Sequence, residues 1–185
     1  MRRPGTLLVV AALALTACGS SGKDAASSSS SATSSTTTTI ATTTTTLAAE
    51  EAVKAAYLAY WKVVDVAFAA PDQPDGLASV AVEPILSFVR DDLASFAAQH
   101  RTYVTPSDRI STHRIDQVSA AGTTATLIDC YVDARVEYAA DGSVIDDSTI
   151  SKTTEVTLVL GPAGWTVSEL SFTTKTNGPM RCAAS

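Results

Sequence analysis

The chain has 185 residues, of which 13 are Lys or Arg and 19 are Asp or Glu, so its formal net charge at pH 7 is -6. A protein with this acidic balance is repelled by phosphate backbones, which argues against nucleic-acid binding. Hydrophobic residues make up 45% of the chain and charged residues 17%, a composition typical of folded proteins. The length favours one main domain accompanied by terminal segments.

Residues 1–17 have the parts of an export signal. Arg2 and Arg3 provide a positive start, and an apolar stretch follows from Leu7 to Leu15. This stretch is shorter than the ~20 residues that a helix needs to cross a bilayer. The sequence therefore predicts a cleaved signal peptide rather than a permanent membrane span.

The segment Leu15–Cys18 resembles the bacterial lipobox, in which the cysteine is acylated and becomes the new N-terminus. Two or three acyl chains, at ~0.8 kcal/mol per buried methylene, hold a protein stably on its membrane. We therefore expect a lipoprotein that is attached through lipid on Cys18 to the extracytoplasmic face of the cell membrane. Removal of Arg2 and Arg3 would take its charge from -6 to -8. An ordinary secretory signal with a chance cysteine is the alternative.

Residues 18–46 are predicted to be a disordered linker. Serine and threonine dominate this segment, in tracts such as 27–31 and 42–46, and such a composition buries too little surface to offset its conformational entropy. As a flexible coil the linker would span roughly 30 Å. Ser/Thr tracts of this kind can also carry O-linked sugar, and the sequence leaves that alternative open.

The remaining residues, 47–185, are expected to form one domain that begins with helices. Apolar residues recur at spacings of three and four along the first of them, and these residues are Val53, Tyr57, Tyr60, Trp61, Val64 and Phe68. A turn-rich segment at 71–76 ends this helix. A short helical segment is expected from Leu77, and a second long helix from Pro84 to about Gln99.

After His100 the period of the pattern changes from helical spacing to two. From Thr124 to Val132 the alternation places Leu127, Asp129 and Tyr131 on one face of a strand. Similar runs are expected at 108–118, 134–138, 153–160 and 165–172, with turn signals between them. Helices followed by strands with short connections predict an α+β fold, in which N-terminal helices pack on an antiparallel sheet.

The helical segment Ala56–Trp61 and the terminal strand segment Gly164–Ser168 resemble the nuclear-transport-factor-2-like (NTF2-like) superfamily, also called cystatin-like or SnoaL-like. The resemblance covers most of residues 47–175, and the combination with a lipobox and a low-complexity spacer is similar to a group of actinobacterial lipoproteins. It implies a bent sheet that wraps the first helix as a cone, whose mouth can hold a small apolar ligand. Members include ketosteroid isomerases, dehydratases and non-catalytic binding domains, so the fold does not assign the function.

Six residues are candidates for a pocket in that cone: Tyr57, Tyr60, Trp61, Asp65, Asp129 and Tyr131. An enzyme similar to ketosteroid isomerase needs a carboxylate facing an apolar pocket and an opposing donor such as tyrosine. The pattern places no such pair with certainty, and the alternative is that Tyr57 and Trp61 are core residues while Asp129 is a solvated strand residue.

No catalytic residue, metal site or cofactor is predicted. His100 and His113 are the two histidines of the chain, and neither has the spacing of metal ligands. His113 lies beside Arg114 on a predicted strand, where the pattern is compatible with a position that faces solvent.

Cys130 and Cys182 remain once Cys18 carries lipid. An even pair of cysteines in an exported protein predicts one disulfide, which would stabilise the fold by about 4 kcal/mol in the chain-entropy model. Two free buried thiols are the alternative.

The leading interpretation is a lipid-anchored cell-surface lipoprotein with a non-catalytic domain that binds a protein partner or a small hydrophobic ligand. One alternative is a small-molecule isomerase or dehydratase of the ketosteroid isomerase type. Another is a structural subunit of an envelope complex, including a homodimer.

Overall fold

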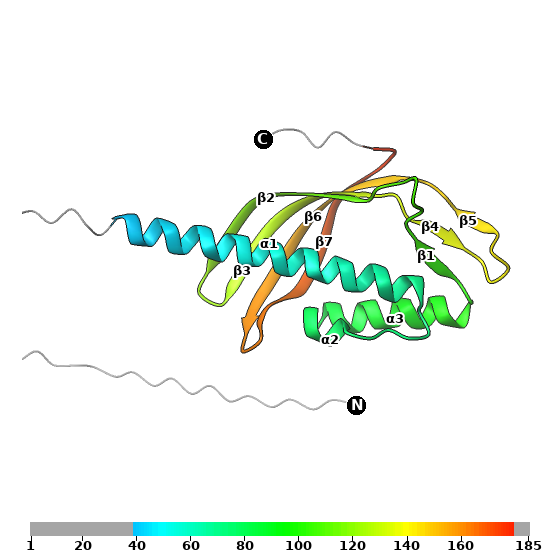
Figure 1. Ribbon diagram of the computed structural model, residues 1–185, viewed down its shortest axis with the longest axis horizontal. Coiled ribbons are helices and arrows are strands. Elements are labelled where there is room, and N and C mark those ends of the chain that lie inside the picture. Colours follow the sequence, from blue (N-terminus) through cyan, green and yellow to red (C-terminus); the bar gives the residue numbers. More distant parts are fainter. Residues whose placement is uncertain (1–38, 180–185) are drawn as a thin grey trace, which may run out of the picture. The chain divides into compact units, whose positions relative to one another are not determined.

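The computed structural model describes residues 39–179, with side chains from Leu47 onward. The helices are α1 (Thr39–Ala69), α2 (Leu77–Val80) and α3 (Ile85–Ala98). The strands are β1 (Thr102–Val104), β2 (Thr112–Ala121), β3 (Thr124–Asp133), β4 (Val136–Tyr138), β5 (Val144–Asp146), β6 (Ile150–Gly161) and β7 (Gly164–Asn177). Helices come first and strands follow (Figure 1), which confirms the predicted α+β class.

Helix α1 begins at Thr39, earlier than the domain start expected at Leu47. From Leu47 onward, its stripe of apolar residues is buried as the spacing of three and four predicted, with Tyr57 and Trp61 in the core. The helix ends at Ala69, two residues before Pro71, and a proline in this place is common after a helix end because it cannot continue the helix. Among residues 39–179, no helix is long and apolar enough to cross a membrane.

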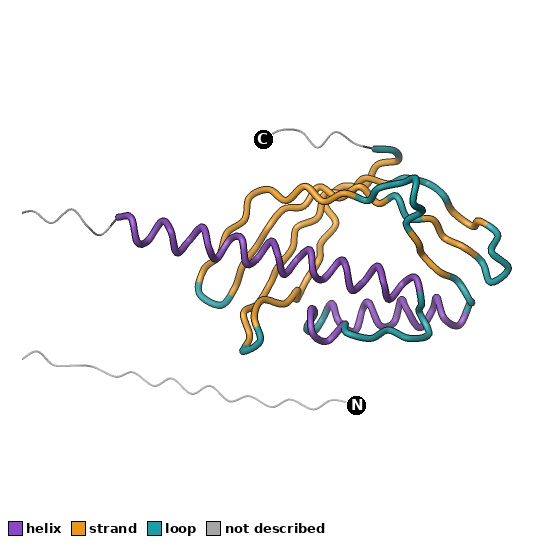
Figure 2. The backbone as a smooth tube through the Cα atoms, in the orientation of Figure 1, coloured by secondary structure: helices purple, strands orange, loops and turns teal. Residues whose placement is uncertain are grey.

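The strands form two antiparallel sheets, one with the order β2-β3-β6-β7 and one with the order β1-β4-β5. The larger sheet curves over α1 (Figure 2), as the family resemblance implied. Strand β2 carries a bulge between Asp116 and Ser119, where Gln117 has a positive φ of 53°. Bulges bend a strand and increase its twist, so this one contributes to the curvature of the sheet edge.

The predicted strands differ from the structure at several ends, and β6 begins at Ile150, before the expected residue 153. Strands β1 and β5 were not predicted, because three residues are too few to show a period of two. Strand β7 continues beyond the expected end at residue 172 to Asn177, where it stays paired with β6. Strand β2 begins later than the expected residue 108, at Thr112.

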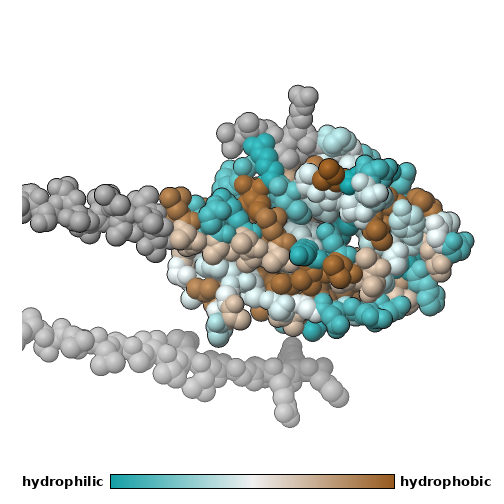
Figure 3. All heavy atoms as spheres, viewed as in Figure 1, coloured by the Kyte–Doolittle hydropathy of each residue, from teal (hydrophilic) through white to brown (hydrophobic). Residues whose placement is uncertain are grey.

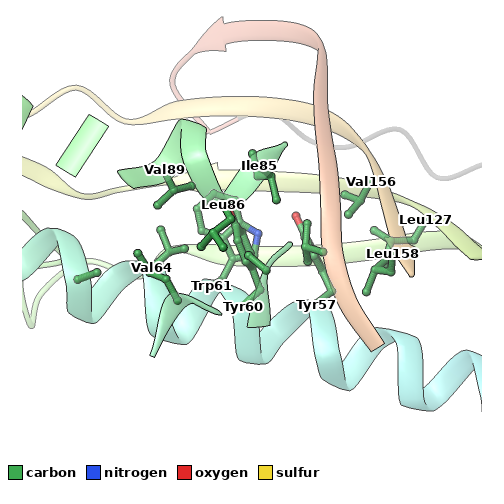
Figure 4. Packing of buried hydrophobic residues seen from close by; sticks show 14 of the residues in the cluster. Tyr57, Tyr60, Trp61, Val64, Ile85, Leu86, Val89, Leu127, Val156 and Leu158 are labelled. Carbon is green, nitrogen blue, oxygen red and sulfur yellow. The ribbon is translucent and has the colours of Figure 1, made fainter. Parts of the chain in front are cut away.

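The core lies between α1, α3 and the concave face of the larger sheet. Figure 4 shows two groups of side chains against α1: Leu127, Val156 and Leu158 from the sheet lie near Tyr57, and α3 residues lie near Trp61. Burial of apolar surface contributes about 25 cal/mol per Å², so this contact is the main source of stability. It also positions α3 beside the end of α1, with β7 close to both helices.

Candidate ligand-binding site

A pocket of about 350 Å³ lies between α1, α3 and the sheet side of the domain. Its lining is mostly apolar, with Tyr60, Trp61, Val64 and Phe68 from α1, Ile85, Phe88, Val89 and Asp92 from α3, and Arg135, Lys152, Leu170 and Phe172 from the sheet side. Hydrophobic side chains also gather near the middle of the face seen in Figure 3. A volume of a few hundred Å³ and an apolar lining with few polar groups are typical of small-molecule sites.

Two aromatic residues on facing walls of the pocket are unusually exposed. Phe88 on α3 is 60% exposed, and Phe172 on β7 is 52% exposed. A smaller hollow of about 200 Å³ shares Ile85, Phe88 and Leu170 with the pocket and extends it along β7. A ligand in this groove would cover apolar surface that water contacts in the free protein, which favours binding.

Two cations in the pocket wall share one buried acid. Arg135 donates from Nε and Nη2 to the two carboxylate oxygens of Asp133, at 2.9 Å each. Lys152 donates from Nζ to Oδ2 of the same carboxylate at 3.2 Å. Arg135 also contacts Asp65, which is 43% exposed, at 3.3 Å. Asp133 itself does not line the pocket.

These contacts shift the pKa values of the acids in opposite directions. Burial would raise the pKa of Asp133, but the hydrogen bonds and charges of Arg135 and Lys152 lower it to about 2. Burial raises the pKa of Asp65, and the charge of Arg135 offsets only part of that effect. Asp133 is therefore the firmly ionised partner that holds both cations in place.

Another acid, Asp129, is fully buried beside the pocket. The hydroxyl of Tyr57 donates to Asp129 Oδ2 at 2.8 Å, and Nδ1 of His113 lies 2.6 Å from the same oxygen. Asp129 Oδ1 has no hydrogen-bond partner among the residues described. The ring of His113 stacks on Tyr131, with centroids 4.4 Å apart, and also contacts Trp61.

The alternative in which Asp129 is a solvated strand residue is wrong, and His113 does not face solvent. Asp129 is 0% exposed because its face of β3, shared with Leu127 and Tyr131, packs toward α1. His113 is paired directly with Tyr131 in the β2–β3 register, so both side chains lie on that same inner face. No local signal in the sequence reports this register.

The buried acid does not open into the pocket. Asp129, His113 and Tyr57 are absent from the pocket lining, whereas Trp61 both lines the pocket and contacts the aromatic residues around the acid. Burial, together with the charge of Asp129, raises the pKa of Tyr57, so its hydroxyl remains a donor. In residues 39–179, no three His, Cys, Asp or Glu side chains gather as metal ligands would.

The six candidate residues therefore take three different places. Tyr60 and Trp61 line the pocket, while Tyr57, Asp129 and Tyr131 are buried outside its lining. Asp65 is partly exposed and contacts Arg135 instead of the pocket.

The predicted pocket set did not contain the other lining residues, among them Phe68, Phe88, Arg135, Lys152, Leu170 and Phe172. Phe68 belongs to the helical stripe that was predicted, so its place near the core could have been found from spacing. The others come from separate elements, and no sequence motif joins them.

The predicted disulfide stays a prediction. Cys130 is buried on β3, but Cys182 lies outside the described residues. Cys18 and the signal peptide also lie outside them.

Comparison with known proteins supports the fold of the domain but does not indicate its function. No family model and no curated protein matches the chain. Among solved structures, the intermembrane space region of the chloroplast protein ARC6 is similar at a TM-score of 0.51 and 19% identity, over 62% of this chain and 89% of that chain. At this identity the likeness concerns the fold alone.

Two further structures match more distantly. A protein assigned as a scytalone dehydratase from Novosphingobium aromaticivorans has a TM-score of 0.45 at 16% identity, over 74% of this chain and 92% of that one. A designed β-sheet protein has a TM-score of 0.37 at 15% identity, over 75% and 98%. The fold and the site together define an α+β domain whose helices pack against antiparallel sheets and leave an apolar pocket beside a buried acid.

Proposed function

We propose that the protein is a lipid-anchored extracytoplasmic lipoprotein whose domain binds a small hydrophobic ligand without catalysis. The observation that carries this proposal is the apolar pocket of about 350 Å³ with the exposed rings of Phe88 and Phe172 on its walls. The anchor rests on the lipobox resemblance around Cys18. A lipid-held domain of this kind would present its pocket outside the cell.

Binding is favoured over catalysis because of where the acid lies. A general base must come within hydrogen-bond reach of the proton that it removes. Asp129 is 0% exposed and does not line the pocket, so a ligand held by Trp61 and Phe172 would not touch it.

A second candidate function is an isomerase or dehydratase. It is favoured by the convergence of Tyr57 and His113 on one oxygen of Asp129, and it requires Trp61 to move so that the acid becomes accessible. Turnover of a small substrate by the wild-type protein, abolished by Asp129→Asn in a protein that remains folded, would replace the binding proposal with this one.

The neutral fluorescent probe N-phenyl-1-naphthylamine tests the binding proposal. The whole exported chain would carry Cys18→Ser to keep it free of lipid. We expect saturable binding at one site, and Leu170→Trp should weaken it at least about tenfold, because a larger side chain occupies the apolar volume. The matched control is Leu160→Trp on β6, since Leu160 is exposed and lies outside the pocket. Absent binding, or equal binding by both variants, would contradict the proposal.

The anchor is tested in bacteria that acylate lipoproteins. We expect the wild-type chain to enter the detergent phase when membranes are extracted and separated by temperature. The Cys18→Ser variant should move to the aqueous phase or the culture medium, because it lacks the acyl chains that hold the protein to lipid. Equal partitioning of the two chains would show that Cys18 is not the anchor.

A further inference from the structure

We infer that the ligand carries one anionic group and that Lys152, supported by Arg135, receives it. This inference rests on the proposed binding function and adds the chemical class of the ligand. The first observation that supports it is the sign of the charged side chains that line the pocket. On the sheet side both charged residues in the lining are cations, whereas their acidic partner Asp133 is not part of the lining.

Lys152 has donor capacity left for a ligand. Its side chain is 19% exposed, and its ammonium contacts one carboxylate oxygen of Asp133 at 3.2 Å. An ammonium carries three N–H donors, so an anion in the pocket can accept one without displacing Asp133. A hydrogen bond between two charged groups is roughly twice as strong as a neutral one.

Lys152 shares its acidic partner, Asp133, with Arg135. Asp133 supplies one negative charge to both Arg135 and Lys152. The second acid near Arg135 is Asp65, which is partly solvated and outside the pocket lining. An anion that docks at Lys152 would therefore meet a cation whose carboxylate partner is shared with Arg135. The setting is partly buried, so charge interactions there are screened less than at the surface.

The remaining charged residue in the lining is Asp92 on α3. Asp92 is exposed to solvent, so it opposes an anion weakly because water and salt screen it. The ring of Phe172 lies 5.3 Å from Lys152 Nζ, which places an apolar wall directly beside the cation. The ligand that fits this arrangement is an apolar body with one acidic head group, such as a medium-chain carboxylate.

Three ligands of equal chain length test the charge of the head group: decanoate, decanol and decylammonium, titrated by calorimetry at pH 7 into the whole exported chain with Cys18→Ser. We expect decanoate to bind most tightly and decylammonium most weakly. Lys152→Met should weaken decanoate at least about tenfold, as expected for loss of a hydrogen bond to a charged group, and should change decanol less than about twofold.

Three matched variants complete the test. Lys152→Arg keeps the cation and should retain most of the decanoate affinity. Asp92→Asn should strengthen decanoate by about twofold, the size expected for a screened surface charge. Lys62→Met, on the exposed side of α1 and outside the pocket, should change nothing.

The outcomes separate the inference from the proposed function. If N-phenyl-1-naphthylamine binds but decanoate binds no better than decanol, or Lys152→Met leaves decanoate binding unchanged, the inference is overturned and the binding function stands. If neither the naphthylamine probe nor any decyl compound binds, both fail. Circular dichroism checks that the Lys152→Met variant is folded. If it is not, the inference is tested by comparing the affinities of the wild-type protein for decanoate, decanol and decylammonium.

Discussion

Replacing Arg135 with methionine is expected to lower the free energy of unfolding by about 3–5 kcal/mol, the usual cost of removing one partner from a buried ion pair. Arg135 donates two hydrogen bonds to Asp133, and both side chains are almost fully buried. Without the guanidinium, Lys152 is the charged partner that Asp133 keeps among the described residues. Urea unfolding at pH 7, followed by circular dichroism, measures the effect.

The control is a double-mutant cycle that compares Arg135→Met, Asp133→Asn and the variant that carries both substitutions. If the cost arises from an uncompensated carboxylate, the double variant should be more stable than the sum of the two single losses predicts. A loss below about 1 kcal/mol in Arg135→Met would show that water or Lys152 compensates Asp133, and that the pair is not held as the structure has it.

The same ion pair should also shape the acid stability of the wild-type protein. The pKa of Asp133 is about 2 in the folded chain, whereas an aspartate in the unfolded chain has the ordinary value of 3.8. Protonation of Asp133 therefore favours the unfolded state. The stability contributed by Asp133 is complete above about pH 3.8 and is lost as the pH falls toward 2. With about 1.4 kcal/mol per pKa unit, this loss amounts to roughly 2.5 kcal/mol. It should be much smaller in Asp133→Asn.

Replacing Trp61 with alanine is expected to cost about 3–5 kcal/mol of unfolding free energy, as large-to-small changes of buried aromatic residues do. The indole is buried and contacts the rings of Tyr57, Tyr60, His113 and Tyr131, with centroids 4.7–6.4 Å apart. Thermal and urea unfolding at neutral pH measure the loss.

Phe88→Ala is the matched control for Trp61→Ala, because Phe88 also lines the pocket but is mostly exposed. It should change the free energy of unfolding by no more than about 0.5 kcal/mol. Equal losses in the two variants would mean that Trp61 is not part of the packed core.

Local patterns in the sequence predicted the elements that are long enough to repeat a burial period. The spacing of three and four residues along α1 identified Val53, Tyr57 and Trp61 as one face, and the alternation along β3 placed Asp129 with Leu127 and Tyr131. Both patterns report on burial because each side chain's direction follows from the backbone geometry of its own element. The order of the two patterns then indicated an α+β fold.

What lies opposite each face depends on contacts between distant segments. The Tyr57–Asp129 hydrogen bond joins residues 72 positions apart, and His113 reaches Asp129 through the pairing of two strands. Because these partners exist only after the sheet closes over α1, the alternation in β3 could not distinguish a buried acid from a solvated one. The pocket arises in the same way, since Lys152 and Phe172 meet Phe88 only when β6 and β7 pack beside α3. The sequence thus specified the faces of the helices and strands, and the packing of those faces created the buried acid and the cationic apolar pocket.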